Sequence, residues 1–105
     1  MLNTKKLLTK LTERYVTDTF KNAAVNITSG TAGTYATYQT IDVSKPGYKP
    51  IGVINAYFSH GSSYQILAEL HVNDPTVYIN YYRVTTSAYS VPAGDITIKV
   101  LYEKA

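Results

Sequence analysis

With 105 residues the chain has room for a single domain. It contains no cysteine, which excludes a disulfide framework and a thiolate metal site. The net charge of +3 comes from residues 1–21, where five basic residues accompany two acidic ones, whereas the rest of the chain is neutral. A basic segment could contact phosphate. A helix face exposed to solvent, or a helix face docked on an acidic partner, is the simpler explanation of the excess of basic residues. Nucleic acid is therefore not the expected partner.

The first expected element is a short N-terminal helix over residues 3–16. Three side chains recur at helical spacing on one face: Leu8, Leu11 and Tyr15. Because so short a helix is marginal alone, it should either pack on its own domain or join helices of other copies in a parallel bundle. Both alternatives stay open. We interpret residues 1–20 as a helix for oligomerisation or attachment, and residues 21–105 as a β domain.

After Phe20 the apolar residues alternate with period two, which is typical of strands. Six strands are expected, over residues 25–27, 35–43, 51–58, 64–72, 77–84 and 96–102. The strand over 51–58 is apolar on both faces and is expected at the centre of the core. Regular spacing and short turns rich in Gly, Pro, Asn and Asp predict an all-β, antiparallel β-sandwich or jelly roll of about six to eight strands.

No residue pattern predicts catalysis. His60 and His71 lie on different elements, and a zinc site would need three or four ligands. No serine stands in a nucleophile elbow, the carboxylates are scattered rather than paired, and no loop has the pattern that cradles phosphate. We therefore expect a non-enzymatic protein without a metal or another cofactor.

The N-terminus also bears on cellular location. Only Leu7 and Leu8 form an apolar pair before the next lysine, which is too short for the core of a signal peptide. No stretch approaches the roughly 18 apolar residues that a membrane span needs. The expectation is a soluble protein made in the cytoplasm, without a signal peptide and without membrane insertion.

Tyrosine is the most informative residue type, because 11 of the 13 aromatic side chains are tyrosines. Alternation along residues 77–84 sends Tyr81 to one face of the strand and Tyr78 and Tyr82 to the other. A sandwich core can account for about half of the tyrosines, but tyrosine is also enriched at protein interfaces. Tyr89, in the polar loop 85–90, is the candidate for an exposed ligand contact. The expected oligomer interface consists of Leu8, Leu11, Tyr15, Tyr78, Tyr81 and Tyr82.

Two stretches carry a resemblance to a known class of proteins, namely GYKPIGVINAYFSH at 47–60 and ITIKVLYEK at 96–104. Together with a short basic leucine-containing helix and a Gly/Thr/Ser linker, they resemble small fibre-tip or appendage proteins of phages and prophages. The resemblance covers about residues 22–104. It implies a trimeric β-sandwich on the virion, whose helix joins the subunits and whose distal loops meet a host surface or other virion proteins. The chain lacks a fibre shaft, so it would be a compact head or tail decoration.

The leading hypothesis is accordingly a non-enzymatic phage structural protein, an oligomeric appendage or fibre-tip module with a possible role in host-surface binding. The alternative is a stand-alone carbohydrate-binding or adhesive domain, which would stack exposed tyrosines such as Tyr89 on the sugars of a cell-surface glycan. The two hypotheses differ in what they require of the chain in solution, because only the first needs stable association.

Overall fold

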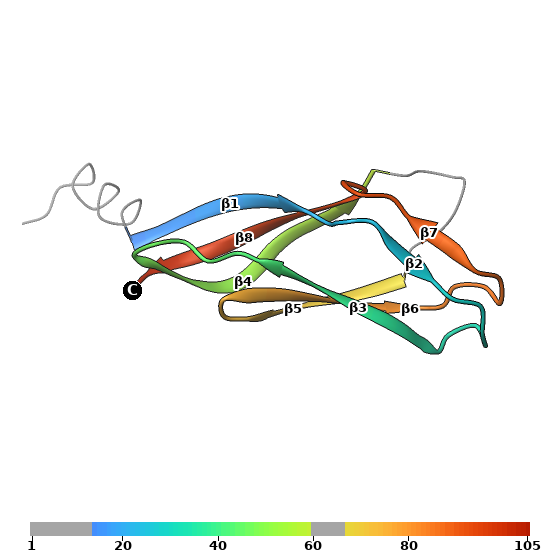
Figure 1. The fold of residues 1–105 in the computed structure, drawn as a ribbon. Coiled ribbons are helices and arrows are strands. Elements are labelled where there is room, and N and C mark those ends of the chain that lie inside the picture. Colours follow the sequence, from blue (N-terminus) through green and yellow to red (C-terminus); the bar gives the residue numbers. More distant parts are fainter. Residues whose placement is uncertain (1–13, 60–66) are drawn as a thin grey trace, which may run out of the picture.

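The computed structural model describes residues 14–59 and 67–105. This part of the chain is all-β, and every pair of neighbouring strands is antiparallel, as the alternation predicts (Figure 1). The strands are β1 (Tyr15–Lys21), β2 (Val25–Ile27), β3 (Tyr35–Asp42), β4 (Tyr48–Phe58), β5 (Leu67–Asn73), β6 (Thr76–Tyr82), β7 (Tyr89–Val91) and β8 (Ile96–Lys104).

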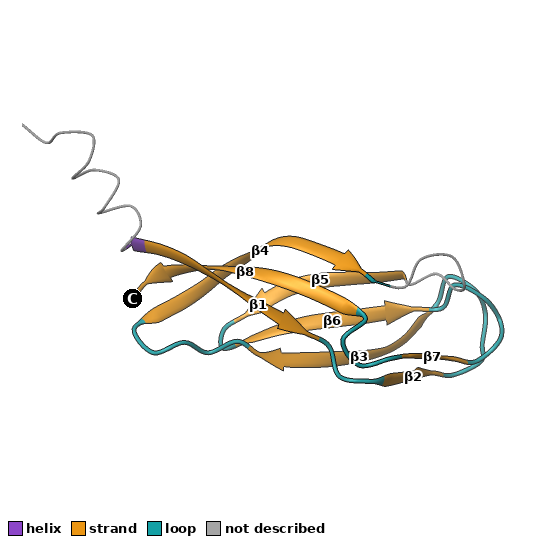
Figure 2. Ribbon diagram, turned by 90° about the horizontal axis from the view of Figure 1, so that it is seen from above, coloured by secondary structure: helices purple, strands orange, loops and turns teal. Residues whose placement is uncertain are grey.

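The strands form two three-stranded sheets, in the orders β1-β8-β4 and β3-β6-β5, and a separate β2-β7 pair. Because β2 follows β1 and β7 precedes β8, the β2-β7 pair continues the β1-β8 ladder along the elongated domain (Figures 1 and 2). The sheet β3-β6-β5 lies across from this long ladder. The central strands β8 and β6 therefore supply most of the side chains between the two layers.

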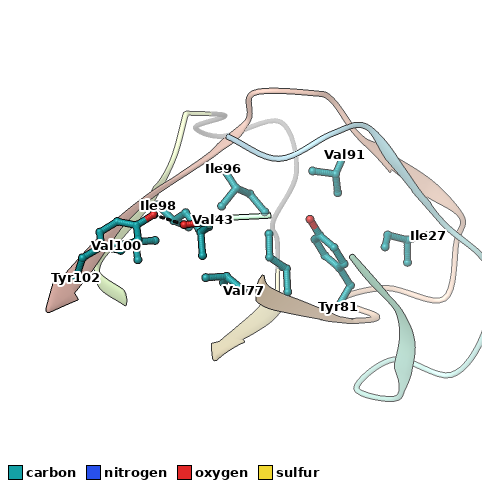
Figure 3. Packing of buried hydrophobic residues seen from close by; sticks show 10 residues of the cluster. Ile27, Val43, Val77, Tyr81, Val91, Ile96, Ile98, Val100 and Tyr102 are labelled. Atoms are coloured by element: carbon teal, nitrogen blue, oxygen red, sulfur yellow. Dashed lines mark hydrogen bonds between the residues drawn. The ribbon is translucent and has the colours of Figure 1, made fainter. Parts of the chain in front are cut away.

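Alternation along β8 and β6 builds the core. In β8 every second residue from Ile96 to Tyr102 is fully buried, and in β6 the same holds from Val77 to Tyr81. Figure 3 shows these side chains converging between the layers, together with Ile27, Val43 and Val91. The hydroxyl of Tyr102 donates a hydrogen bond of 2.5 Å to the carbonyl of Val43, so this large ring is buried without an unsatisfied polar atom.

The expectation of a doubly buried central strand at residues 51–58 is wrong. β4 lies at one edge of the sheet β1-β8-β4, and the side chains of Ile51 and Ile54 are 42% and 53% exposed. The register against β8 shifts at two β-bulges, between Pro50 and Gly52 and between Val53 and Asn55. Each bulge inserts one extra residue, which breaks strict alternation. The two-sided apolar pattern thus reflects an irregular edge strand, and β8 has the central position instead.

The predicted helix is wrong for Tyr15 and Val16, because β1 begins at Tyr15 and pairs with β8 over its whole length. The half-buried residues of β1 recur with period two rather than at helical spacing. Residues 15–20 consequently belong to the β domain and not to an N-terminal helical segment. Residues 1–13, including Leu8 and Leu11, lie outside the residues that the structure describes, so the remainder of the helix stays a prediction.

The other predicted strands lie close to their expected positions, although residues 64–66 of the expected strand 64–72 lie outside the described residues. Besides β1, one further strand is not expected. β7 (Tyr89–Val91) occupies part of the predicted polar loop 85–90 and pairs with β2. Its signal in the sequence is weak, because only three residues pair and the partner lies more than 60 positions away. With β1 and β7 the number of strands in the described residues is eight, the upper end of the expected range.

The buried phenol of Tyr81 predicts a loss of stability at alkaline pH. Burial, the largest cause, raises the pKa of Tyr81 from 10.0 to about 12, with a smaller contribution from the nearby Asp95 charge. Above pH 10 the unfolded chain loses this proton while the folded chain keeps it. The stability contributed by this residue is therefore complete below pH 10 and should be lost as the pH rises through about 12.

Urea unfolding of the native chain and of Tyr81→Phe, at several pH values from about 8 to 12, tests this expectation. Near neutral pH the variant should be about 1 kcal/mol less stable, because it loses the hydrogen bond to Gln39. Above pH 10 the native chain should lose about 1.4 kcal/mol per pH unit relative to the variant, so the two curves should meet and then cross before pH 12. Tyr57→Phe, which removes a hydroxyl from an exposed ring, controls for the loss of a phenol as such. Parallel curves up to pH 12 would contradict the assignment.

Candidate functional site: a tyrosine face on the sheet β3-β6-β5

The outer face of the sheet β3-β6-β5 gathers aromatic side chains from all three strands. Alternation turns Tyr78, Asn80 and Tyr82 of β6 outward, because Val77, Ile79 and Tyr81 are buried. Residues directly opposite one another in an antiparallel pair share a face, and the register thereby adds partners from β3 and β5. We call this surface the tyrosine face: Tyr35, Tyr38, Leu67, Glu69, His71, Tyr78, Asn80 and Tyr82.

A β-bulge in β3 brings Tyr35 to this face. Tyr35 lies opposite Tyr82, but Thr37 lies opposite the inward-facing Tyr81, so the register shifts between Tyr35 and Thr37. Simple alternation groups Tyr35 with Thr37 on one face and leaves Tyr38 on the other. The extra residue, Ala36, places Tyr35 and Tyr38 on the same outer surface.

The rings of this face pack against each other across the strands. His71 and Tyr78 stack with centroids 5.1 Å apart and an interplanar angle of 12°. Tyr38 lies 5.8 Å from Tyr78 at 37°, and Tyr35 lies 5.8 Å from Tyr82 edge to face. Such pairs contribute about 0.5–1.5 kcal/mol beyond their buried area. The rings consequently form an ordered surface, although Tyr35 and Tyr38 remain 50% and 56% exposed.

One carboxylate lies among the tyrosines. Glu69 accepts a hydrogen bond of 2.8 Å from the Tyr82 hydroxyl and one of 3.4 Å from the Asn80 amide. The bond to Glu69 is the largest cause of a raised pKa at Tyr82. β3, β5 and β6 contain no lysine or arginine, whereas Asp42 and Glu69 both lie on their outer face. The tyrosine face is therefore aromatic and acidic.

Arg83 fixes one end of the tyrosine face. Its guanidinium donates hydrogen bonds to the carbonyl and hydroxyl of Thr28, each 3.0 Å, and to the hydroxyl of Thr34, also 3.0 Å. A further bond of 2.6 Å reaches the carbonyl of Tyr35. The planar group thus joins the β2-β3 loop to the end of β6 and holds the backbone from which Tyr35 projects.

The structure separates the residues expected at an interface. Tyr78 and Tyr82 share the tyrosine face, but Tyr81 has no exposed surface and cannot contact a partner in the folded chain. Tyr15 lies on the other three-stranded sheet, in β1, and is 38% exposed. The expectation that Tyr89 lies in an exposed loop is wrong. Tyr89 is the first residue of β7 and packs half-buried against the core.

Most of the tyrosine face was not predicted. Tyr35, Tyr38, Leu67 and Glu69 were absent from the expected interface, since their placement depends on which strands pair and in what register. The spacing of Tyr35 and Tyr38 would not have revealed their shared face, because without the bulge alternation places them on opposite faces.

Residues 14–59 and 67–105 contain neither a cluster of metal ligands nor a membrane-spanning helix. No group of three or more His, Cys, Asp or Glu side chains there could hold a metal ion. In the same part of the chain, no helix has the length and apolar character needed to cross a membrane. His60 lies outside these residues, and His71 is part of the stacked row of rings.

Comparison with known proteins identifies no relative of the chain. No protein-family model matches the chain, and no curated protein or solved structure is significantly similar to it.

Proposed function

We propose that this chain is a non-enzymatic assembly and binding module, a β-sandwich whose tyrosine face is its contact surface. The observation that carries the proposal is the exposure of Tyr35, Tyr38 and Leu67, each about half exposed, on one ordered outer face. Exposed rings with polar tips are the side chains that dominate protein interfaces. A surface of this kind in a small domain is best explained by a partner that covers it.

The packing of the rings favours a protein partner over a sugar. Tyr78 lies on the central strand of its sheet, with His71 against it from β5 and Tyr38 against it from β3. These neighbours occupy the ring faces that a pyranose would need, and they leave ring edges and hydroxyls for contact. Among the rings of the tyrosine face, Tyr35 and Tyr38 retain the large exposed surfaces needed for stacking. Glycan binding through these two rings is the second candidate function.

The proposed context is a virion appendage built from several copies of the chain, with three as the expected number. This context and the copy number rest on the sequence resemblance of residues 47–60 and 96–104 to phage appendage proteins. The exposed tyrosine face supports the more general part of the proposal, association through a β-sheet surface. It is compatible with contacts to further copies or to other virion proteins.

Association should depend on the exposed rings. The native chain is expected to run as a multiple of its 11.6 kDa mass in size exclusion with light scattering. Replacing both Tyr35 and Tyr38 by serine removes two exposed rings, and the mass should fall toward that of one chain. Stability should fall by no more than about 1–3 kcal/mol, the contribution of the two ring pairs, because neither side chain belongs to the buried core.

The double variant Tyr35→Phe and Tyr38→Phe is the matched control, because it keeps the rings and removes only the hydroxyls. It should remain associated, with at most a moderate weakening. A native chain that stays monomeric at high concentration would count against the proposed function. Binding of a monomeric native chain to a glycan array, lost on replacing both tyrosines by serine, would support the second candidate instead.

A further inference from the structure

We propose that the partner of the tyrosine face is the opposite face of a second copy of the same chain. This inference rests on the proposed function and specifies which surfaces meet. The opposite face is the outer side of the sheet β1-β8-β4, and it carries an exposed lysine on each strand. We call it the lysine face: Thr19, Lys21, Lys49, Asn55, Tyr57 and Lys99.

The register places these residues on one surface. Lys99 of β8 lies opposite Thr19 of β1 and Asn55 of β4, while Thr97 lies opposite Lys21 and Tyr57. Lys49 lies one pair from the end of the β4-β8 ladder, opposite Glu103. Since β8 buries the alternate residues from Ile96 to Tyr102, the side containing Lys99 is the outer one.

The charge on the lysine face is positive. Glu103, on the same side, forms an ion pair of 3.0 Å with Arg14, and Asp18 pairs with Lys45 at 2.8 Å. These are the two ion pairs that occur within the described residues, and neither involves the lysines of this face. Three exposed lysines therefore lie on one side of the domain, and Glu69 and Asp42 lie on the other.

Opposite charges on the two sides favour contact between unlike faces. If two tyrosine faces met around a two-fold axis, the carboxylates of Glu69 and Asp42 in one chain would approach the same carboxylates in the other chain. Like charges brought together at an interface are costly. If a tyrosine face meets a lysine face, the carboxylates approach ammonium groups. The lysines can also lie over exposed tyrosine rings, which attract cations. Tyr57, 55% exposed, adds an aromatic group to the lysine side.

Contact between unlike faces has a consequence for the shape of the assembly. Each copy would use one face toward the copy before it and the other face toward the copy after it. Such head-to-tail contacts close into a ring when the rotation between copies permits closure, and otherwise continue as an open chain. The expected trimer corresponds to a ring that closes after three copies.

Charge reversal on each face tests the inference. Glu69→Lys makes both faces basic, and Lys99→Glu introduces an acidic group into the lysine face. Each variant alone should associate at least about tenfold more weakly than the native chain. In an equimolar mixture the altered tyrosine face of Glu69→Lys meets the altered lysine face of Lys99→Glu, and the two unaltered faces meet each other, so association should be regained in part. Recovery is only partial because a ring of three copies built from two variants keeps one contact between like variants. Light scattering after size exclusion measures the weakening in each single variant and the recovery on mixing. The same measurement on the native chain at about 0.05 M and 0.5 M salt should show weaker association at the higher salt.

The controls separate this inference from the proposed function. Glu69→Gln removes the charge but keeps an acceptor for the Tyr82 hydroxyl, so it should weaken association less than Glu69→Lys. Partial recovery of association in the mixture, with both single variants weakened, would establish the contact. If the native chain is oligomeric and sensitive to the tyrosine variants, but mixing restores nothing, the lysine face is not the partner while the tyrosine face remains the contact surface. A monomeric native chain would overturn both.

Discussion

Asn22→Ala is expected to lower the free energy of unfolding by about 3 kcal/mol, although the change removes only a small polar side chain. Asn22 is 4% exposed and lies where the β1-β8 ladder ends and the β2-β7 ladder begins. Its amide group donates to the carbonyls of Ala23 and Pro92, at 2.8 and 3.1 Å. Its side-chain oxygen accepts the backbone N–H of Ile96 at 2.8 Å, in a buried environment.

The position of Asn22 explains why the loss should be large. The turn between β7 and β8, residues 92–95, interrupts the ladder opposite Asn22, and Pro92 has no N–H to donate. The asparagine side chain replaces the missing ladder bonds. Alanine would leave the N–H of Ile96 buried without a partner, and each such group costs about 1–3 kcal/mol. The backbone bonds between Asn22 and Gly94 or Ile96 cannot compensate, because they are already made.

Urea unfolding followed by circular dichroism measures the effect, and Asn26→Ala is the matched control. Asn26 is exposed in β2 and its side chain accepts one hydrogen bond, 2.8 Å, from the hydroxyl of Ser90. Its replacement should cost less than about 1 kcal/mol. Equal losses for the two variants would show that the junction does not depend on the buried amide.

The fold could be predicted from the sequence where strands alternate regularly. β8 carries Ile96, Ile98 and Val100 at period two, and the structure buries all three. β4 departs from the predicted central position, and its two-sided apolar pattern arises because Ile51 and Ile54 are extra residues in two bulges. A bulge is defined by the partner strand, so its position cannot be derived from one strand alone.

The candidate site could be predicted only in part for a related reason. The outward direction of Tyr78 and Tyr82 follows from alternation within β6, and the sequence predicts it. Their neighbours Tyr38 and Glu69 come from β3 and β5, and they meet because of strand order and register. Both depend on contacts between residues far apart in the chain, which leave no local pattern. The Glu69 carboxylate therefore could not be assigned to an aromatic surface before the sheet was known.

Arg83→Ala is expected to lower the free energy of unfolding by about 2 kcal/mol, because four hydrogen bonds from one guanidinium are lost together. Arg83→Lys should recover less than half of this loss, since an ammonium group cannot reproduce the planar fork that spans Thr28 and Thr34. Arg14→Ala is the matched control. Arg14 makes one exposed ion pair with Glu103, and its loss should have little effect on stability.

The neighbouring glycine provides a second test of the same contact. A Cβ atom on Gly30 would lie 2.5 Å from Nε of Arg83 and 2.8 Å from its Cζ, so Gly30→Ala should displace the guanidinium from Thr28. In the native background the substitution should destabilise by an amount comparable to Arg83→Ala. In the Arg83→Ala background it should cost almost nothing, because the displaced group is already absent. Additive losses, measured by urea unfolding of the two single variants and the double variant, would show that Gly30 acts independently of Arg83. Coupled losses would mean that one arginine sets the geometry of the loop end from which Tyr35 joins the tyrosine face.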